Sequence, residues 1–215
     1  MPRPTHPLLS REAVVATAVR VIDSEGLAAC SLPRLARELS VKAPSLYHHF
    51  DDRADIMAEV ARYIVWQTPI PKEQTGDWIE WFVELAVNFR RTILDHPNAA
   101  QILLEYVPRD VLSTLYDNAA RRLQEANVPS HLHVMILDGV EALCLGSGLT
   151  QAMRKSGGRS QIFPAVNHDQ SALAAAVTAS HWTTAEEVFA EVLRNFLRGV
   201  TMSDEPARST TPVSL

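Results

Sequence analysis

Side chains that can bind a phosphate or read a base edge are concentrated between Lys42 and Arg53. The stretch reads K-A-P-S-L-Y-H-H-F-D-D-R and offers an ammonium, a hydroxyl, a phenol, two imidazoles and a guanidinium. Such groups form hydrogen bonds with base edges in the major groove and with the phosphates of double-stranded DNA. The candidate DNA-binding residues are Lys42, Ala43, Pro44, Ser45, Tyr47, His48, His49 and Arg53.

Two short helices joined by a tight turn would position these side chains. Ser31 can cap the first helix, and Pro33 falls in its first turn, where a missing N–H does no harm. Residues 40–43 interrupt the helical period, and Pro44 begins a second helix with a preset φ. The apolar face of the first helix consists of Leu32, Leu35, Ala36 and Leu39. This spacing is typical of a helix-turn-helix, although an ordinary helical corner with a solvated outer face would share it.

The same residues resemble the DNA-binding head of the TetR family of bacterial repressors. The similarity lies in the run L-x-R-L-A-R-E-L-S-V-K-A-P-S-L-Y-H-H-F-D-D-R-A-D-I-M and covers about residues 9–64. Ser40 stands where the family usually has a turn glycine. Leu32-Pro33 stands where many members have a Thr-Arg pair that touches DNA. The resemblance implies an all-α protein, with a three-helix head joined by a linking helix to a larger ligand-binding and dimerisation body.

Composition is compatible with a cytoplasmic regulator. The chain has 215 residues, of which 47% are hydrophobic and 21% charged, and its apolar runs look too short to span a bilayer. We expect neither a signal peptide nor a membrane partner. The two cysteines are far apart in the sequence and predict reduced thiols. Although the net charge is −5, residues 1–50 hold six basic and four acidic side chains, which suits a protein that meets phosphates at one end.

The pattern of helices and breaks predicts four segments. Residues 1–9 are expected to be a flexible arm, 10–67 the DNA-binding head with its linking helix, 68–202 the body, and 203–215 a disordered tail. In the head, Ser10 begins the first helix and Gly26 ends it, and the linking helix runs from about 53 to 67. In the body we expect a helix capped by Asp77, a long central helix over 131–153, a mobile loop over 154–167, and a short helix over 169–179.

The last helix carries a wide apolar stripe. Thr183 or Thr184 can cap it, and its apolar residues recur at i, i+3, i+4 and i+7 between 185 and 200. Part of the stripe can pack on the helix over 131–153, which offers glycines for close approach. The residues of the expected two-fold interface are Gly139, Ala142, Gly146, Val188, Phe189, Val192, Phe196 and Leu197. A homodimer is typical of the TetR family, although both helices could also lie wholly inside one chain.

A surplus of large side chains in the body predicts a cavity for a small apolar or aromatic effector. The candidate ligand-binding residues are Trp66, Trp81, Phe82, Phe89, Leu103, Tyr106, Tyr116 and Met135. Any one of them could equally be plain core, and the cavity itself is implied by the family resemblance. The body resembles the tetracycline-binding branch around L-D-H-P-N-A-A and V-E-A-L-C-L-G. That branch places a metal-coordinating histidine where this chain has Ala142 and Cys144, so metal–tetracycline binding does not carry over.

Catalytic and metal-binding motifs are absent from the sequence. It contains no Gly-rich phosphate loop, G-x-S-x-G, H-E-x-x-H or C-x-x-C, so we expect no catalytic residue, metal or cofactor. The leading hypothesis is a ligand-responsive repressor that binds a palindromic operator. The alternatives are an all-helical enzyme with a coincidental basic head, and a binding protein that uses its head for protein contacts.

Overall fold

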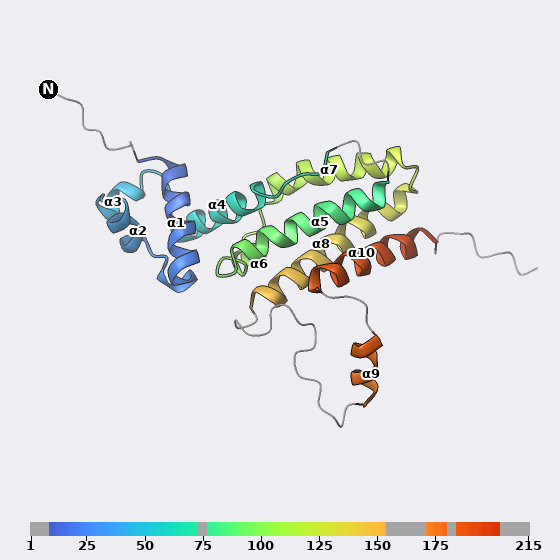
Figure 1. The fold of residues 1–215 in the computed structure, drawn as a ribbon. Helices are drawn as coiled ribbons and strands as arrows, with labels where there is room; N and C mark the ends of the chain where they lie inside the picture. Colours follow the sequence, from blue (N-terminus) through green and yellow to red (C-terminus); the bar gives the residue numbers. More distant parts are fainter. Residues whose placement is uncertain (1–8, 73–76, 154–170, 180–183, 203–215) are drawn as a thin grey trace, which may run out of the picture. The chain divides into compact units, whose positions relative to one another are not determined.

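The computed structural model describes residues 9–72, 77–153, 171–179 and 184–202, and every regular element in these ranges is a helix (Figure 1). The all-α expectation is therefore confirmed. The elements are α1 (Arg11–Glu25), η1 (Leu27–Ala29), α2 (Leu32–Glu38), α3 (Ala43–Leu46), α4 (Arg53–Trp66), α5 (Trp78–Asp95), α6 (Ile102–Glu105), α7 (Arg109–Glu125), α8 (Ser130–Ala152), α9 (Ser171–Ala179) and α10 (Ala185–Met202). The expected arm (apart from residue 9), loop and tail lie outside the described residues.

The chain divides into two compact units. The first comprises Met1–Thr68, Arg91–Thr114 and Gly148–Met153, and the second comprises Pro69–Arg90, Leu115–Ser147 and Arg154–Leu215. The helices α5, α7 and α8 each contribute residues to both units. The first unit therefore contains the N-terminal helices together with the end of α5, all of α6, the start of α7 and the end of α8.

Capping groups in the first unit begin and end its helices as the residue types predict. The side chain of Ser10 accepts a hydrogen bond from the Ala13 N–H at 3.1 Å. Gly26, with a φ of 89°, ends α1 and donates its N–H to the Ile22 carbonyl at 2.8 Å. Ser31 caps α2, and Asp52 caps α4 by accepting the Asp55 N–H at 2.9 Å.

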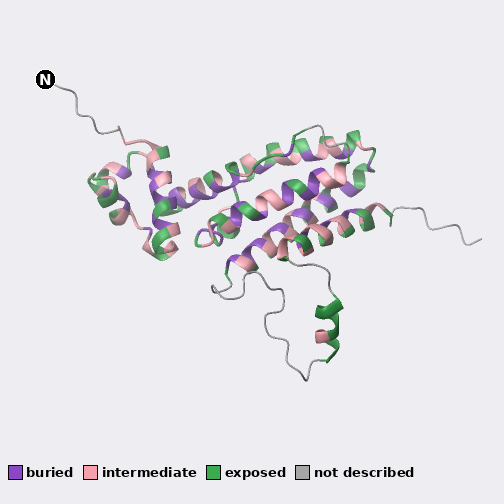
Figure 2. Cartoon of the chain, in the orientation of Figure 1, coloured by how far each residue is buried: buried purple, intermediate pink, exposed green. Residues whose placement is uncertain are grey.

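The second unit has its own apolar core, to which α5, α7, α8 and α10 all contribute (Figures 1 and 2). Trp81 and Phe82 pack edge to face with their ring centroids 5.2 Å apart. At the start of α10 the Thr184 hydroxyl accepts the Glu187 N–H while the Glu187 carboxylate accepts the Thr184 N–H, each at 3.1 Å. This reciprocal pair is a capping box, and it selects Thr184 over Thr183 as the cap.

The helix α8 is 23 residues long and apolar enough to cross a membrane by length and composition alone. That length differs from the expectation that no apolar run is long enough. The helix supplies Ile136 and Cys144 to the core of the second unit. Both cysteines, Cys30 in the first unit and Cys144 in the second, are buried and free.

Candidate nucleic-acid interface

The candidate DNA-binding residues lie in α3, on either side of it and at the start of α4, and two buried side chains anchor the α3 region. Lys42 precedes the helix, and its carbonyl accepts the Ser45 N–H at 2.9 Å. Leu46 and Phe50 are both buried, and the Leu46 carbonyl accepts the N–H groups of His49 and Phe50 at 2.9 and 3.0 Å. The exposed residues between Lys42 and Phe50 are Lys42, Pro44, Tyr47 and His48, with Ala43, Ser45 and His49 half-buried.

The turn before α3 passes through a left-handed residue. Ser40 has a φ of 54°, a conformation that L side chains rarely adopt and that glycine takes readily. Its N–H donates to the Arg37 carbonyl at 3.1 Å, and the Val41 N–H donates to the Ala36 carbonyl at 2.9 Å. The departure from glycine noted in the sequence therefore leaves the turn in place, with a serine in a strained conformation.

Most arginines of this region are engaged within the chain. Arg34 forms ion pairs with Glu25 at 2.6 Å and with Glu38 at 2.7 Å, and these hydrogen bonds hold the pKa of both carboxyl groups below their usual value. Arg53, predicted to bind DNA, donates to the carbonyls of Cys30 at 3.0 Å and Leu27 at 3.2 Å. These bonds attach the start of α4 to η1 and give Arg53 a structural role.

Arg37 and Lys42 are the exposed cations nearest the turn. Neither forms an ion pair with any residue in the described part of the chain. Arg37 was not among the residues singled out from the sequence. The signal that could have found it is its position on the polar side of α2, two residues before Leu39 and five before Lys42.

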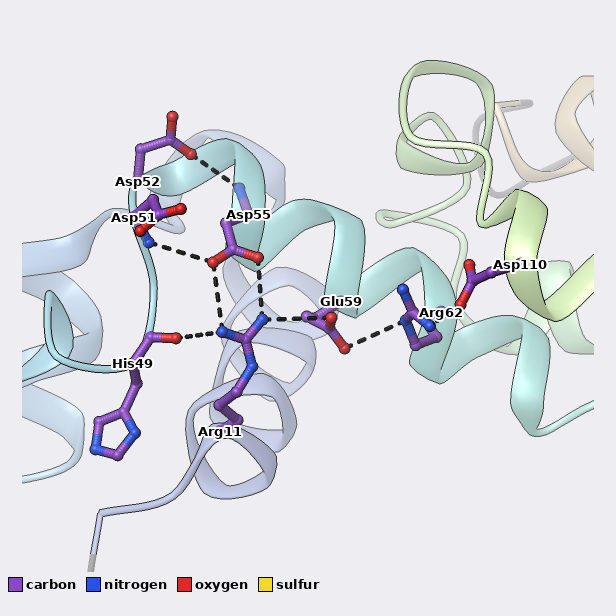
Figure 3. A network of polar contacts seen from close by, with 8 residues as sticks. All are labelled: Arg11, His49, Asp51, Asp52, Asp55, Glu59, Arg62 and Asp110. Atoms are coloured by element: carbon purple, nitrogen blue, oxygen red, sulfur yellow. Dashed lines mark hydrogen bonds and ion pairs between the residues drawn. The ribbon is translucent and has the colours of Figure 1, made fainter.

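A polar network centred on Arg11 connects the start of α1 with the segment after α3 and with α4 (Figure 3). Its guanidinium donates to the His49 carbonyl, to Asp55 at 3.0 Å and to Glu59 at 3.3 Å, and lies 4.3 Å from the centroid of the Phe50 ring. The network continues within the first unit, because Glu59 is 3.4 Å from Arg62 and Arg62 pairs with Asp110 at the start of α7. No local sequence pattern indicates these contacts, because the partners lie far apart in the chain.

The candidate effector residues are divided between the two units. Trp81 and Phe82 are buried in the core of the second unit, with Phe89 packed against it, whereas Leu103 and Tyr106 belong to the first unit. The Tyr116 hydroxyl donates to the Glu141 carboxylate.

Two of the candidate effector residues lie at the surface. Trp66 is 71% exposed and Met135 is 48% exposed, so neither belongs to the buried core. Trp66 is the last residue of α4, and Met135 lies on the outer side of α8, next to the exposed Val134.

The apolar stripe of α10 has two sides with different partners. Phe189 and Leu197, expected at a dimer interface, are buried in the core of their own unit, which corrects that assignment. Phe196 packs on Gly139 of the same chain, since a Cβ added to Gly139 would lie 2.2 Å from its Cζ atom. Val192 is 46% exposed, and Val188 is half-buried. On α8, Ala142 and Gly146 are exposed.

One buried cation in the second unit was missed in the sequence. Arg90 on α5 is only 1% exposed, and its Nε donates to the Ser147 hydroxyl of α8 at 2.9 Å. Glu186 lies 3.9 Å from the guanidinium, and the ring centroid of Phe189 lies 5.6 Å from its central carbon. Hydropathy cannot distinguish such an arginine from its exposed neighbour Arg91, because the distinction depends on helix packing. Among the described residues no group of three or more His, Cys, Asp and Glu could hold a metal ion.

Two family models match the chain. "Bacterial regulatory proteins, tetR family" matches residues 14–60, and "Tetracyclin repressor-like, C-terminal domain" matches residues 70–203. An HTH-type transcriptional regulator of Saccharopolyspora erythraea is 31% identical over 98 residues, which are 46% of this chain and 42% of that protein. The tetracycline repressor protein class E of Escherichia coli is 26% identical over 148 residues, 66% of this chain and 69% of that protein. The chain thus spans less than half the length of the first of these relatives.

Solved structures share the fold. ActR from Streptomyces coelicolor in complex with (S)-DNPA has a TM-score of 0.70 and 25% identity, and the match covers 89% of this chain and 98% of that one. BioQ with its double-stranded DNA operator has a TM-score of 0.61 and 24% identity, covering 69% of this chain and 90% of that one.

Proposed function

The chain belongs to the TetR family of bacterial transcriptional regulators. We propose that it is a repressor that binds a near-palindromic operator as a homodimer. In this proposal a small apolar or aromatic molecule releases it from DNA. The observation that carries the proposal is α3. Leu46 in α3 and Phe50 after it are buried and fix the helix on the first unit, while Lys42, Pro44, Tyr47 and His48 remain exposed for DNA. Residues 10–67 act as the DNA-binding part and 68–202 as the effector and dimerisation part, in the cytoplasm.

Different residues around α3 have different tasks on DNA. Pro44 and Ser45 lie in the first turn of α3 and His48 lies in the turn after it, where we propose that side chains reach base edges. Lys42 and Tyr47 lie at its borders and contact phosphates, and the exposed Arg37 is a further cation for this task. The DNA complex of BioQ supports this use of the fold, although at 24% identity it says nothing of the sequence that this chain would read.

The proposed dimer seam consists of the sides of α8 and α10 that the chain leaves uncovered. Ala142 and Gly146 give α8 a surface that a partner helix can approach closely, and Val188 and Val192 add apolar area from α10. A two-fold axis would bring these surfaces together from two copies. The two recognition helices would then meet half-sites about one DNA turn, or a little more, apart.

The effector part of the proposal draws on solved structures of the same fold. ActR has been solved with (S)-DNPA and with actinorhodin, and a TetR from Acinetobacter baumannii with minocycline. In this chain the linking helix α4 would act as the lever, and its exposed terminal Trp66 would sense the bound molecule. Ligand and DNA would oppose each other by the same coupling free energy, typically about 1–3 kcal/mol.

A gel-shift assay with the DNA upstream of the protein's own gene tests the proposal. The wild type should shift this fragment in the presence of excess random duplex, and His48→Ala should lose the preference while its thermal unfolding stays unchanged. Glu125→Gln, an exposed change at the end of α7, serves as the matched control. Selection from a random DNA library extends the test, and a wild type that enriches no sequence would overturn the proposal.

A further inference from the structure

We infer that Arg11 is a positioning residue for DNA readout. It fixes the backbone segment that follows the recognition helix α3 and does not itself contact DNA. The inference rests on the proposed use of α3 on DNA. Arg11 is the first residue of α1, and its guanidinium links three separate elements: α1, the segment after α3, and α4 (Figure 3).

The contacts of Arg11 use the fork geometry of a guanidinium. Its first terminal nitrogen donates to the His49 carbonyl and lies 3.5 Å from Asp55 Oδ2. Its second donates to Asp55 Oδ1 at 3.0 Å and to Glu59 Oε1 at 3.3 Å. The planar group also lies over the buried Phe50 ring, with 4.3 Å to the centroid. A lysine ammonium is a point charge and cannot reproduce these parallel bonds and the stacking together.

These bonds hold both ends of the short segment that follows the recognition helix. The His49 carbonyl is bound by Arg11 directly, and the Asp51 N–H donates to the Asp55 carboxylate at 3.2 Å. The same carboxylate is the main partner of Arg11, and its hydrogen bond raises the pKa of the guanidinium. One ion pair therefore fixes the backbone on either side of Phe50, immediately after the exposed His48.

Loss of this ion pair should affect base readout more than overall affinity. Without the guanidinium, the His49 carbonyl loses its donor and the segment carrying His48 can shift by a fraction of an ångström. Base contacts depend on such distances, whereas contacts of Lys42 and Tyr47 with phosphates tolerate them, because phosphate binding is largely electrostatic. The expected result is a selective loss of affinity for the operator relative to random DNA.

The test compares three variants on two DNA probes. The variants are Arg11→Gln, Asp55→Asn and the control Arg20→Gln. Arg20 is another α1 arginine, and it pairs with Glu38 at 3.6 Å. The probes are the operator fragment selected by the wild type and a random duplex of equal length, with dissociation constants measured by fluorescence anisotropy at several salt concentrations. Circular dichroism melts confirm that each variant is folded.

Arg11→Gln and Asp55→Asn should each weaken operator binding about tenfold, the loss of about one good base contact, while random-duplex affinity and the salt slope stay unchanged. Arg20→Gln should leave both affinities within about twofold. Asp55→Asn keeps the cation, so it separates positioning from charge.

Several results would overturn the inference. An equal fall on both probes, with a salt slope smaller by about one, would make Arg11 a phosphate contact. If the wild type prefers the operator over the random duplex and Arg11→Gln keeps the same preference, this inference alone is overturned. A wild type with no preference would overturn the proposed function and this inference with it. If Arg11→Gln fails to fold, the operator preference of Asp55→Asn decides the question.

Discussion

The Nδ1 atom of His96, just after α5, lies 2.8 Å from the Oδ2 atom of Asp23 in α1. Asn98 strengthens the same junction by donating to the Asp23 backbone carbonyl at 3.0 Å, and the Gln67 amide nitrogen lies 3.2 Å from His96 Nε2. The other carboxylate oxygen of Asp23 is buried without a hydrogen-bond partner among the described residues. The first unit thus ties α1 to the segment between α5 and α6 through one histidine–carboxylate contact.

Removal of His96 should destabilise the first unit. In His96→Ala the Asp23 carboxylate loses its partner while it remains partly buried, which should lower the free energy of unfolding by about 1–3 kcal/mol. The Asp23→Ala/His96→Ala double variant should lose less than the sum of the two single variants. Denaturant titrations measure both quantities, with the exposed His48→Ala as the matched control. Additive effects would show that the 2.8 Å contact contributes no coupling energy.

Replacement of Ser40 by glycine should stabilise the protein. Ser40 has a φ of 54°, and glycine relieves the steric strain of this conformation at the cost of a more flexible unfolded chain. The expected gain is about 0.5–1 kcal/mol in the free energy of unfolding. Asn127→Gly is the matched control at a φ of 58°, where the expected gain is smaller because asparagine tolerates the left-handed region. A destabilised Ser40→Gly variant in chemical denaturation would contradict the strain.

The ion pair between Glu80 and Arg194 should make stability depend on pH in the acid range. Arg194 donates to both carboxylate oxygens at 2.7 and 2.9 Å, and these hydrogen bonds hold the pKa of Glu80 below its usual value of 4.5. Unfolding restores the usual pKa, so the unfolded chain binds a proton more readily. The stabilisation is therefore present above about pH 5 and is lost as the pH falls through the lowered pKa.

The magnitude of this effect is modest because the Glu80 side chain is 42% exposed. The wild type should exceed Glu80→Gln in stability by about 0.5–1 kcal/mol at pH 7, and the difference should vanish near pH 3. Urea titrations at pH 7, 5 and 3 measure it, with the exposed Glu84→Gln as the control. A difference that stays constant over this range would contradict the assignment.

Two glycines of α8 should respond differently to a larger side chain. A Cβ on Gly139 would collide with Phe196, whereas a Cβ on Gly146 would meet no heavy atom of the same chain within 4 Å. Gly146→Leu is therefore acceptable within one chain but would block close approach of a second copy. We expect it to weaken dimerisation by at least about tenfold in sedimentation equilibrium. The matched control is Gln124→Leu on the exposed side of α7, and equal dimer affinity for both variants would argue against this seam.

Lys42 should contribute to affinity without choosing the sequence. Removal of one phosphate contact weakens all duplexes similarly and reduces the slope of log affinity against log salt by about one. His48→Ala should instead lose about 1–3 kcal/mol on the operator alone, because it removes a base contact. Anisotropy titrations of Lys42→Ala and His48→Ala at several salt concentrations distinguish the two roles. A Lys42→Ala variant that relaxes the preference at one base pair would reverse the assignment.

Local signals predicted the helices well because each depends on residues close in the sequence. Ser10, Ser31 and Thr184 cap helices, and Gly26 ends α1, as their side chains dictate. The long α8 was likewise expected within one residue of its observed ends, Ser130 and Ala152. Capping and periodicity act over a few residues, so they can be read without knowledge of the tertiary structure.

The features that could not be predicted from the sequence depend on packing between residues far apart in the chain. The stripe of α10 indicated an apolar face, yet only the structure shows that Leu197 points into the core and Val192 outward. The sequence likewise does not indicate which arginines bind groups of the chain itself. Arg53 was predicted to bind DNA, yet it donates to the carbonyls of Cys30 and Leu27. Such partners lie more than twenty residues away, and which cations they occupy depends on how the helices pack.

The buried thiols allow the local opening of each unit to be measured separately. Burial raises the pKa of Cys30, and raises that of Cys144 to about 12, so the reactive thiolate is scarce at neutral pH. An alkylating reagent reaches either sulfur only when the surrounding helices open, and the labelling rate then measures the free energy of that local opening. Cys30 reports on the first unit and Cys144 on the second. A molecule that slows labelling at one cysteine and not the other thereby identifies the unit that it makes rigid.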